Sequence, residues 1–303
     1  MMMKLLTVLP VILALASFSV KAETIVVAGS TTIKPIFDHL NYVLRQGKIS
    51  LPAEEVKSID AINQTLGPDQ IAQIKQHFNS YVFNVRPGGS SKGVKSAFDN
   101  QVDIGMASRA LKEKESPLKS SLDVVSIGSD ALVFMVSTTN SVDNIPLNSL
   151  SQAFSGQIKT CEELGTTGGK IRLLGKGSHH GTHDVFLAKL NLKGKKLAPI
   201  TYFEDELTIT KSIAQRFKNG LAFGSLGAIP NNALGQTVKL VSVDGVAPMV
   251  DGQFNSQYGY VRPLNLVVNK SSSNKPGVKV VLEFFKTESG KALVKAYGFV
   301  PTP

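Results

Sequence analysis

Short apolar runs rich in β-branched residues alternate along this chain with loops of glycine, serine and threonine, and with stretches whose apolar residues recur at helical spacing. The first such unit has a strand over residues 24–28, a loop over 29–32 and a helix that begins near Pro35. Proline suits the first turn of a helix, which supports this start. Strands that alternate with helices are typical of an α/β fold with a mostly parallel sheet.

The same rhythm continues to the C-terminus, interrupted by one polar, helix-prone segment over residues 47–80. A Leu-Gly-Pro break divides this segment, which we interpret as surface helices or an insertion. The apolar stretches 122–127 and 131–136 are predicted to carry the chain from a first lobe to a second, and 238–243 and 260–268 to bring it back. The other predicted strands are 81–85, 102–106, 171–174 and 221–224. Further helices are predicted to start at Val94 and to cover residues 147–154, 184–190, 212–218, 278–285 and 290–297.

The N-terminal residues have the layout of a secretory signal peptide. Lys4 supplies positive charge, residues 5–19 are mostly apolar, and Ala22 is a small residue suited to cleavage. We expect residues 1–22 to be removed and the mature protein to be soluble in the periplasm. The apolar stretch is short for a bilayer span, and no cysteine lies near the cleavage point to carry a lipid anchor. Cys161 is the only cysteine, so an internal disulfide is excluded.

The charge of the chain bears on its partners. The net charge of +10 falls by two, to +8, when Lys4 and Lys21 leave with the signal peptide. A positive field of this size favours small anions and polyanions. The basic residues are scattered and form no run interleaved with aromatic residues, so nucleic acid is not predicted as a partner. The length of the mature chain favours one large lobe or two ordinary ones.

Three loops share one design, since residues 29–32, 88–93 and 175–182 each follow a predicted strand and open a predicted helix. At a helix N-terminus several amides lack intrahelical partners, and the peptide dipoles leave partial positive charge there. Such a loop can hold an anion, although serine and threonine more often simply cap the helix. None of the loops has the spacing of a nucleotide-binding motif. Their repetition predicts a cleft in which three helix starts surround one tetrahedral oxyanion.

Several segments, in the same order along the chain, resemble the phosphate-binding proteins of bacterial phosphate ABC transporters. Residues 27–32 resemble the first phosphate loop of that family, 88–94 the second, and 102–109 the segment that follows. Further matching pieces are residues 147–150, 153–156, 245–248 and 260–264. The resemblance covers nearly all of the mature chain except residues 47–80. It implies an α/β, two-lobed periplasmic binding protein fold of type II, with a two-strand hinge and a central cleft.

The resemblance also implies a function. The protein would capture inorganic phosphate, or a similar oxyanion, and present it to an ABC permease in the inner membrane, as a monomer that is not an enzyme and needs no cofactor. Lobe one would comprise residues 23–125 and 241–303, and lobe two residues 126–240. The ligand-binding residues carried over from matching positions are Ser30, Thr31, Thr32, Ser90, Ser91, Ser108, Arg109, Lys176, His180, Gly181 and Thr182.

The third loop departs from the family pattern, which has arginine and then Ser-Gly-Thr. Lys176 stands at the arginine position, and His180 replaces the serine. Lysine keeps the charge but loses the planar, two-pronged grip on an oxyanion. Arg109 stands where many relatives have an aspartate that accepts the proton of phosphate, and arginine cannot accept a hydrogen bond. Either a neutral His180 or a serine hydroxyl takes over that task, or the preferred ion is a relative such as sulfate or arsenate.

The histidines near this loop admit other chemistry. Helical spacing of His179 and His183 would place two rings on one face, as in some zinc sites, but no further ligands are evident and no metal is predicted. Ser178 and Asp184 beside His180 suggest a hydrolase triad, although the strained G-x-S-x-G elbow is absent. The aspartates interpreted as helix caps or surface charges are Asp103, Asp130 and Asp205. The alternative functions are a secreted phosphatase or metal-dependent hydrolase, and a surface or matrix protein that has lost transport.

Overall fold

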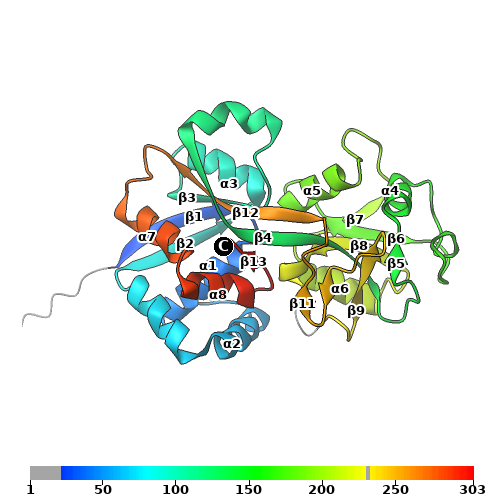
Figure 1. Ribbon diagram of the computed structural model, residues 1–303, viewed down its shortest axis with the longest axis horizontal. Helices are drawn as coiled ribbons and strands as arrows, with labels where there is room; N and C mark the ends of the chain where they lie inside the picture. The colour runs from blue at the N-terminus through cyan, green and yellow to red at the C-terminus, as the bar shows by residue number, and fades with distance from the viewer. Residues whose placement is uncertain (1–21, 230–232) are drawn as a thin grey trace, which may run out of the picture.

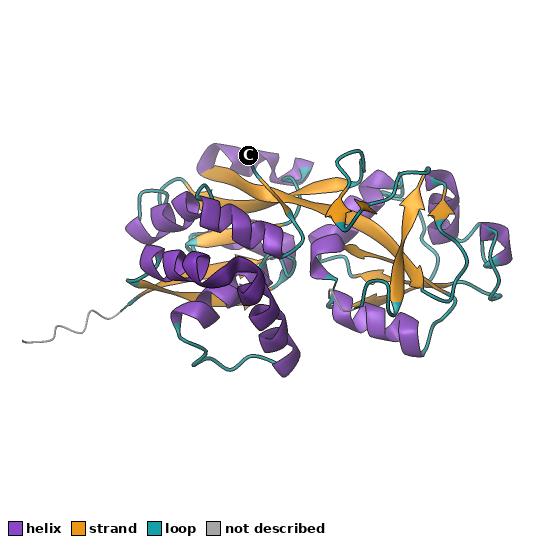
Figure 2. Cartoon of the chain, turned by 60° about the horizontal axis from the view of Figure 1, so that its bottom comes forward, coloured by secondary structure: helices purple, strands orange, loops and turns teal. Residues whose placement is uncertain are grey.

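The structure of the protein is a computed structural model that describes residues 22–229 and 233–303. The chain forms two lobes that lie side by side and are joined by two long strands (Figure 1). Each lobe has its own core of buried aliphatic and aromatic residues, with helices packed around the strands (Figure 2). The predicted α/β architecture of two lobes with a two-strand hinge is confirmed.

The first lobe is built on three parallel strands, with the first strand in the middle. β1 (Glu23–Gly29) pairs with β2 (Tyr81–Pro87) on one side and β3 (Ile104–Ala107) on the other. Helix α1 (Lys34–Leu44) follows β1, and α3 (Gly89–Phe98) follows β2, so both helices begin at the carboxyl ends of strands. The other elements of this lobe are α2 (Ala53–His77), the 3-10 helix η1 (Glu113–Ser121), α7 (Pro276–Phe284), α8 (Glu288–Ala296) and β13 (Val300–Pro301).

The segment 47–80 is more than a surface insertion, because α2 contributes to the core of the first lobe. Ile62 and Ile74 are buried there, and α2 packs on α1 and α8. The helix is interrupted at Gly67, which has φ +77 and ψ 169 and precedes Pro68. Proline cannot donate its amide and clashes with the preceding turn, so the break falls where the sequence predicts it.

The second lobe repeats the same plan. β6 (Arg172–Lys176) lies between β7 (Ile200–Phe203) and β8 (Gly220–Ser225), all parallel. Helix α5 (Gly181–Lys189) follows β6, and α6 (Glu206–Gln215) follows β7. The other elements of this lobe are β5 (Asn144–Ile145), α4 (Leu147–Ser155), the 3-10 helices η2 (Glu162–Leu164) and η3 (Leu226–Ala228), β9 (Val238–Val243), β10 (Met249–Val250) and β11 (Gln253–Phe254).

The helix predicted over residues 212–218 begins earlier, at Glu206. Asp205 is its N-cap, and the carboxylate accepts hydrogen bonds from the amide of Thr208 at 2.7 Å and from its hydroxyl at 3.1 Å. The interpretation of Asp205 as a cap is therefore confirmed. The prediction began too late because threonines occupy the first turns of the helix and weaken its apolar pattern.

The hinge consists of two antiparallel strands, β4 (Leu122–Ser137) and β12 (Val261–Asn269). The sequence predicts two separate strands, over residues 122–127 and 131–136, but in the structure β4 is one continuous strand. Residues 128–130 stay extended because they pair with β12. Asp130 lies directly opposite Arg262 in this register. The two residues sit where the strands pass from the core of one lobe to the core of the other.

The return to the first lobe comes later than the sequence suggests. Strand β9 was expected to take part in it, but Val238 and Val241 are buried in the core of the second lobe, and β9 pairs with β5 and with the second-lobe part of β4. Tyr258 is buried in the same core. Strand β12 makes the return, so the second lobe extends to about residue 260 and the boundary at 241 is wrong.

The expected signal peptide lies, apart from Ala22, outside the described residues. Among the helices of residues 22–229 and 233–303, none combines the length and the apolar character that a bilayer span requires.

Candidate functional site

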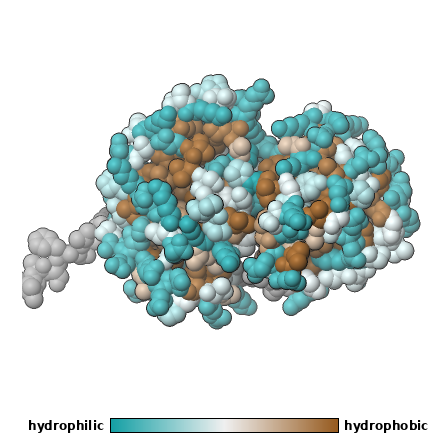
Figure 3. All heavy atoms as spheres, viewed as in Figure 1, coloured by the Kyte–Doolittle hydropathy of each residue, from teal (hydrophilic) through white to brown (hydrophobic). Residues whose placement is uncertain are grey.

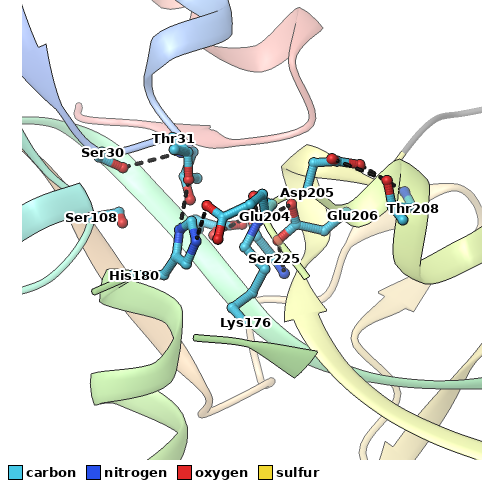
Figure 4. A network of polar contacts seen from close by, with 12 residues as sticks. Ser30, Thr31, Ser108, Lys176, His180, Glu204, Asp205, Glu206, Thr208 and Ser225 are labelled. Atoms are coloured by element: carbon cyan, nitrogen blue, oxygen red, sulfur yellow. Dashed lines mark hydrogen bonds and ion pairs between the residues drawn. The ribbon is translucent and has the colours of Figure 1, made fainter. Parts of the chain in front are cut away.

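Three helices begin where the lobes face each other, α1 and α3 from the first lobe and α5 from the second. Thr31 Oγ1 lies 2.9 Å from His180 Nδ1 across the boundary (Figure 4). A β-carbon on Gly181 would lie 2.5 Å from Ser90 Oγ and 2.8 Å from Ser108 Oγ. The structure thus brings the three Gly/Ser/Thr loops together between the lobes. A furrow separates the two lobes on the face that Figure 3 shows.

The loop between β1 and α1 is shaped by its own hydroxyl group. Ser30 Oγ accepts hydrogen bonds from the amides of Thr32 at 3.2 Å and Ile33 at 3.4 Å, as a helix cap does. Gly29 has φ +131, and a β-carbon there would collide with the carbonyl oxygen of Met106, so only glycine fits. Ser30 therefore shapes the loop as an acceptor, and its own hydroxyl hydrogen is left for a further partner.

The first turn of α3 is tied to the end of β3. Ser90 Oγ accepts a hydrogen bond from the amide of Ser108 at 3.1 Å and lies 3.4 Å from Ser108 Oγ. Both serines are buried. The two serines form a polar surface on the first lobe, directly opposite the Gly181 backbone of α5.

Thr182 is the clearest sign that a ligand belongs here. Its side chain is buried, and its Oγ1 has no hydrogen-bond partner among the described residues. A buried polar group without a partner costs about 1–3 kcal/mol, so native proteins rarely leave one. Gly181 and Thr182 are the first two residues of α5, where backbone amides have no intrahelical acceptor. The helix start thus offers amides and an unused hydroxyl to an anion.

Both ring nitrogens of His180 have a partner, one in the first lobe and one within the second lobe. Nδ1 faces the Thr31 hydroxyl, and Nε2 lies 3.2 Å from Oε2 of Glu204. A carboxylate can only accept, so Nε2 carries the hydrogen and Nδ1 accepts from Thr31. Burial, together with the charges of Lys176 and His179, lowers the pKa of His180 to about 4, and the ring is neutral at neutral pH. With both nitrogens engaged, His180 has no free nitrogen to accept a ligand's proton.

Lys176 is not the free cation that the resemblance implies. Its ammonium group is buried and donates to the carbonyl oxygen of Glu204 and, at 3.1 Å, to Oε2 of Glu206. Glu206 is itself buried, so the two charges neutralise each other. Lys176 therefore holds the loop that leads into α6 against the end of β6.

Arg109 is paired in a similar way. Its two terminal nitrogens each donate to Glu115 at 2.8 Å, and Nη2 donates to Ser91 Oγ at 3.1 Å. Asp184 of the second lobe lies 3.1 Å from Nε and 2.8 Å from the ammonium group of Lys112. Arg109 thus positions Ser91 and contributes to an ion-pair contact between the lobes, and its charge is already balanced.

Comparison with known proteins places the chain in a family. A family model described as the PBP superfamily domain matches residues 19–289. The chain belongs to the PBP superfamily. Two curated relatives are the phosphate-binding protein PstS of Borreliella burgdorferi, 23% identical, and protein SphX of Synechococcus elongatus, 26% identical. Each comparison covers 90% of this chain and 88% of the relative.

Solved structures show the same fold. A protein from Clostridium perfringens whose crystal structure contains bound phosphate is 21% identical, with a TM-score of 0.72, and the match covers 93% of this chain and 100% of that one. An ABC-type phosphate transport receptor from Vibrio cholerae is 23% identical, with a TM-score of 0.67, covering 92% and 100% of the two chains. The chain therefore has the two-lobed fold of periplasmic binding proteins.

In this member of the PBP superfamily, the loops rest on a buried ion pair that the sequence analysis missed. Arg262 Nε and Nη2 donate to Oδ2 of Asp130 at 2.9 and 2.7 Å, and both side chains are buried. Arg262 also donates to Thr32 Oγ1 at 3.1 Å and to the carbonyl and hydroxyl oxygens of Ser108 at 3.2 Å. Asp130 in turn accepts from Ser225 Oγ at 2.7 Å. The interpretation of Asp130 as a cap or surface charge is wrong.

The pair therefore connects both hinge strands to loops of both lobes. One signal in the sequence was available: a charged residue interrupts an apolar run at Asp130 and again at Arg262. A charge inside an apolar strand usually requires a partner, because burying it alone is costly.

The histidine cluster differs from the one predicted. His179 precedes α5, so it shares no helix face with His183, whose ring packs against the aromatic rings of Phe186, Tyr202 and Phe223. His179 Nε2 instead lies 3.0 Å from the Glu204 carboxylate. The suggested triad is not formed, since the ring of His180 contacts Thr31 and Glu204, and Asp184 contacts Arg109 and Lys112.

Proposed function

We propose that this protein captures inorganic phosphate between its lobes, outside the cytoplasm, and presents it to an ABC permease. The observation that carries the proposal is the convergence of three helix N-termini on buried hydroxyl groups, one of which, Thr182 Oγ1, lacks a partner among the described residues. The identity of the ion is supported by the PstS relative, which is a phosphate-binding protein, and by the phosphate in the Clostridium perfringens structure.

The chemistry of the site suits an anion held by dipoles rather than by free charges. Arg109 and Lys176 are already neutralised by Glu115 and Glu206. Backbone amides at helix starts, and hydroxyl groups, then supply the donors, and hydrogen bonds to a charged partner are worth about 1.5–3 kcal/mol each. The neutral ring of His180 accepts the hydrogen bond of the Thr31 hydroxyl and so fixes the position of that side chain.

Binding between the lobes also explains how capture is signalled. An anion that contacts α1 and α3 of one lobe and α5 of the other stabilises the closed arrangement, because only that arrangement offers all contacts at once. The hinge of β4 and β12 allows the lobes to separate and release the ion. A permease that recognises the closed arrangement would receive loaded protein only.

Isothermal titration calorimetry of the purified protein with phosphate and with sulfate tests the proposal. We expect one phosphate per chain and affinity for sulfate at least about tenfold weaker, a difference of about 1.4 kcal/mol. No phosphate heat at any concentration, or tighter binding of sulfate, would overturn the assignment of phosphate.

Replacing Thr182 by valine separates a ligand contact from a structural role. Valine has nearly the same shape but no hydroxyl, so we expect phosphate affinity to fall by about 10–100-fold, as expected for one hydrogen bond to a charged ligand. The free energy of unfolding without phosphate should stay the same or rise, because Oγ1 has no partner among the described residues to lose.

The matched control is Thr210→Val in α6. Thr210 is equally buried, and its Oγ1 donates to the carbonyl oxygen of Leu207 at 2.9 Å. This variant should lose stability but keep phosphate affinity. Calorimetry and urea unfolding measure the two quantities. Unchanged phosphate affinity in Thr182→Val would remove Thr182 from the site.

A further inference from the structure

Two imidazole rings and one carboxylate converge at the edge of the candidate site. Nε2 of His179 and Nε2 of His180 lie 3.0 and 3.2 Å from the same oxygen, Oε2 of Glu204, and the ring centroids of the two histidines are 4.0 Å apart. Their candidate ligand atoms all lie within 4.8 Å of one another. An ordinary surface ion pair, worth about 0–1 kcal/mol, gives no reason to gather two imidazoles on one oxygen.

We propose that His179, His180 and Glu204 form a binding site for a borderline divalent cation of the Zn²⁺ class. Zn²⁺ binds histidine nitrogen and carboxylate oxygen at about 2.0–2.1 Å, which places neighbouring ligand atoms of a tetrahedron about 3.3 Å apart. The distances from Nε2 of each histidine to Oε2 of Glu204 are close to this edge length. Two imidazoles favour Zn²⁺ over hard cations such as Mg²⁺ and Ca²⁺, which prefer oxygen ligands.

The surroundings of the three side chains fit this assignment. The side chains of His179 and Glu204 are 50% and 74% exposed, so a cation reaches them from solvent, while His180 is buried and fixed. The carbonyl oxygen of Glu204 accepts from Lys176, which anchors the loop that carries the carboxylate.

The cation would also act on the neighbouring lobe. A metal on Nε2 of His180 displaces the single hydrogen of the neutral ring from that nitrogen, and the ring then carries its hydrogen on Nδ1 and donates it to Thr31 Oγ1. The Thr31 hydroxyl, which now donates to His180, is then free to donate elsewhere. If phosphate binds as proposed above, the cation should raise phosphate affinity, and phosphate should raise cation affinity by the same factor. This coupling rests on the proposed function, whereas the cation site does not.

Calorimetric titration of the full chain, carrying no histidine tag, with Zn²⁺ in buffer free of phosphate tests the site. We expect one Zn²⁺ per chain, and visible absorption typical of four-coordinate Co²⁺ when cobalt is used as the probe. His179→Ala and Glu204→Gln should each weaken Zn²⁺ binding by at least about tenfold. His77→Ala is the matched control and should bind as the wild type does, because His77 lies on α2 and contacts the carbonyl of Val280.

The two proposals fail separately. Absence of Zn²⁺ binding, or binding that both His179→Ala and Glu204→Gln leave within about twofold of wild type, would overturn the cation site. Titration with phosphate in the presence of a chelator tests the anion site alone. If the protein binds phosphate but not Zn²⁺, the proposed function stands and the cation site is refuted. If it binds Zn²⁺ but not phosphate, the cation site stands and the proposed function is refuted.

Discussion

Replacement of Asp130 by asparagine is expected to lower the free energy of unfolding by about 3–5 kcal/mol, the usual cost of removing one partner of a buried ion pair. The asparagine would keep the shape of the side chain but leave the Arg262 guanidinium without its counter-charge in the core. Both side chains are essentially inaccessible, 1% exposed for Arg262 and 0% for Asp130. Water therefore cannot compensate. Urea-induced unfolding without ligand measures the change.

The same variant should also weaken phosphate binding. Arg262 donates to Thr32 Oγ1 and to Ser108, so a displaced guanidinium disturbs two of the loops that converge on the candidate site. Asp143→Asn is the matched control. Asp143 pairs with Lys239 at 2.5 Å but is 83% exposed, and its loss should change the free energy of unfolding by less than about 1 kcal/mol. A loss below about 1 kcal/mol in Asp130→Asn as well would contradict a structural role for the hinge pair.

The local elements were predictable because their causes are local. The apolar pattern of β1 and the helical spacing that starts at Pro35 are readable within a dozen residues, and so is the break before Pro68. Helix α6 and the continuous strand β4 were predicted less well. In both cases a polar stretch hides the pattern: threonines in the first turns of α6, and Gly-Ser-Asp in β4, which stays extended because it pairs with β12.

The charged residues of the candidate site show what sequence alone could not supply. A resemblance carries residue types over to matching positions, but the state of a charge depends on its partner. Lys176 meets Glu206, and Arg109 meets Glu115, so neither cation is free. The pairing of Arg262 with Asp130 joins residues 132 positions apart in the sequence. Such contacts depend on how the two lobes pack, and a local sequence pattern does not predict that packing.

Replacement of Gly181 by alanine is expected to reduce phosphate affinity by about 100-fold or more, roughly 2.7 kcal/mol, with little change in stability. Gly181 is the first residue of α5, and a β-carbon there would lie 2.5 Å from Ser90 Oγ, 2.8 Å from Ser108 Oγ and 3.0 Å from the Ser108 carbonyl oxygen. All three atoms belong to the opposite lobe. The added methyl group therefore leaves the fold of the second lobe intact and opposes the approach of the lobes.

The effect follows from the balance between open and closed arrangements. A ligand that contacts both lobes binds fully only to the closed arrangement, so any energy that opposes closure is subtracted from its affinity. Gly259→Ala is the matched control, because no described atom lies within 4 Å of a β-carbon at that position. Calorimetry should show weak phosphate binding in Gly181→Ala and wild-type binding in Gly259→Ala, with similar urea midpoints for both. Wild-type affinity in Gly181→Ala would mean that phosphate does not require the contact between α5 and the two serines, and the anion would then have to bind elsewhere.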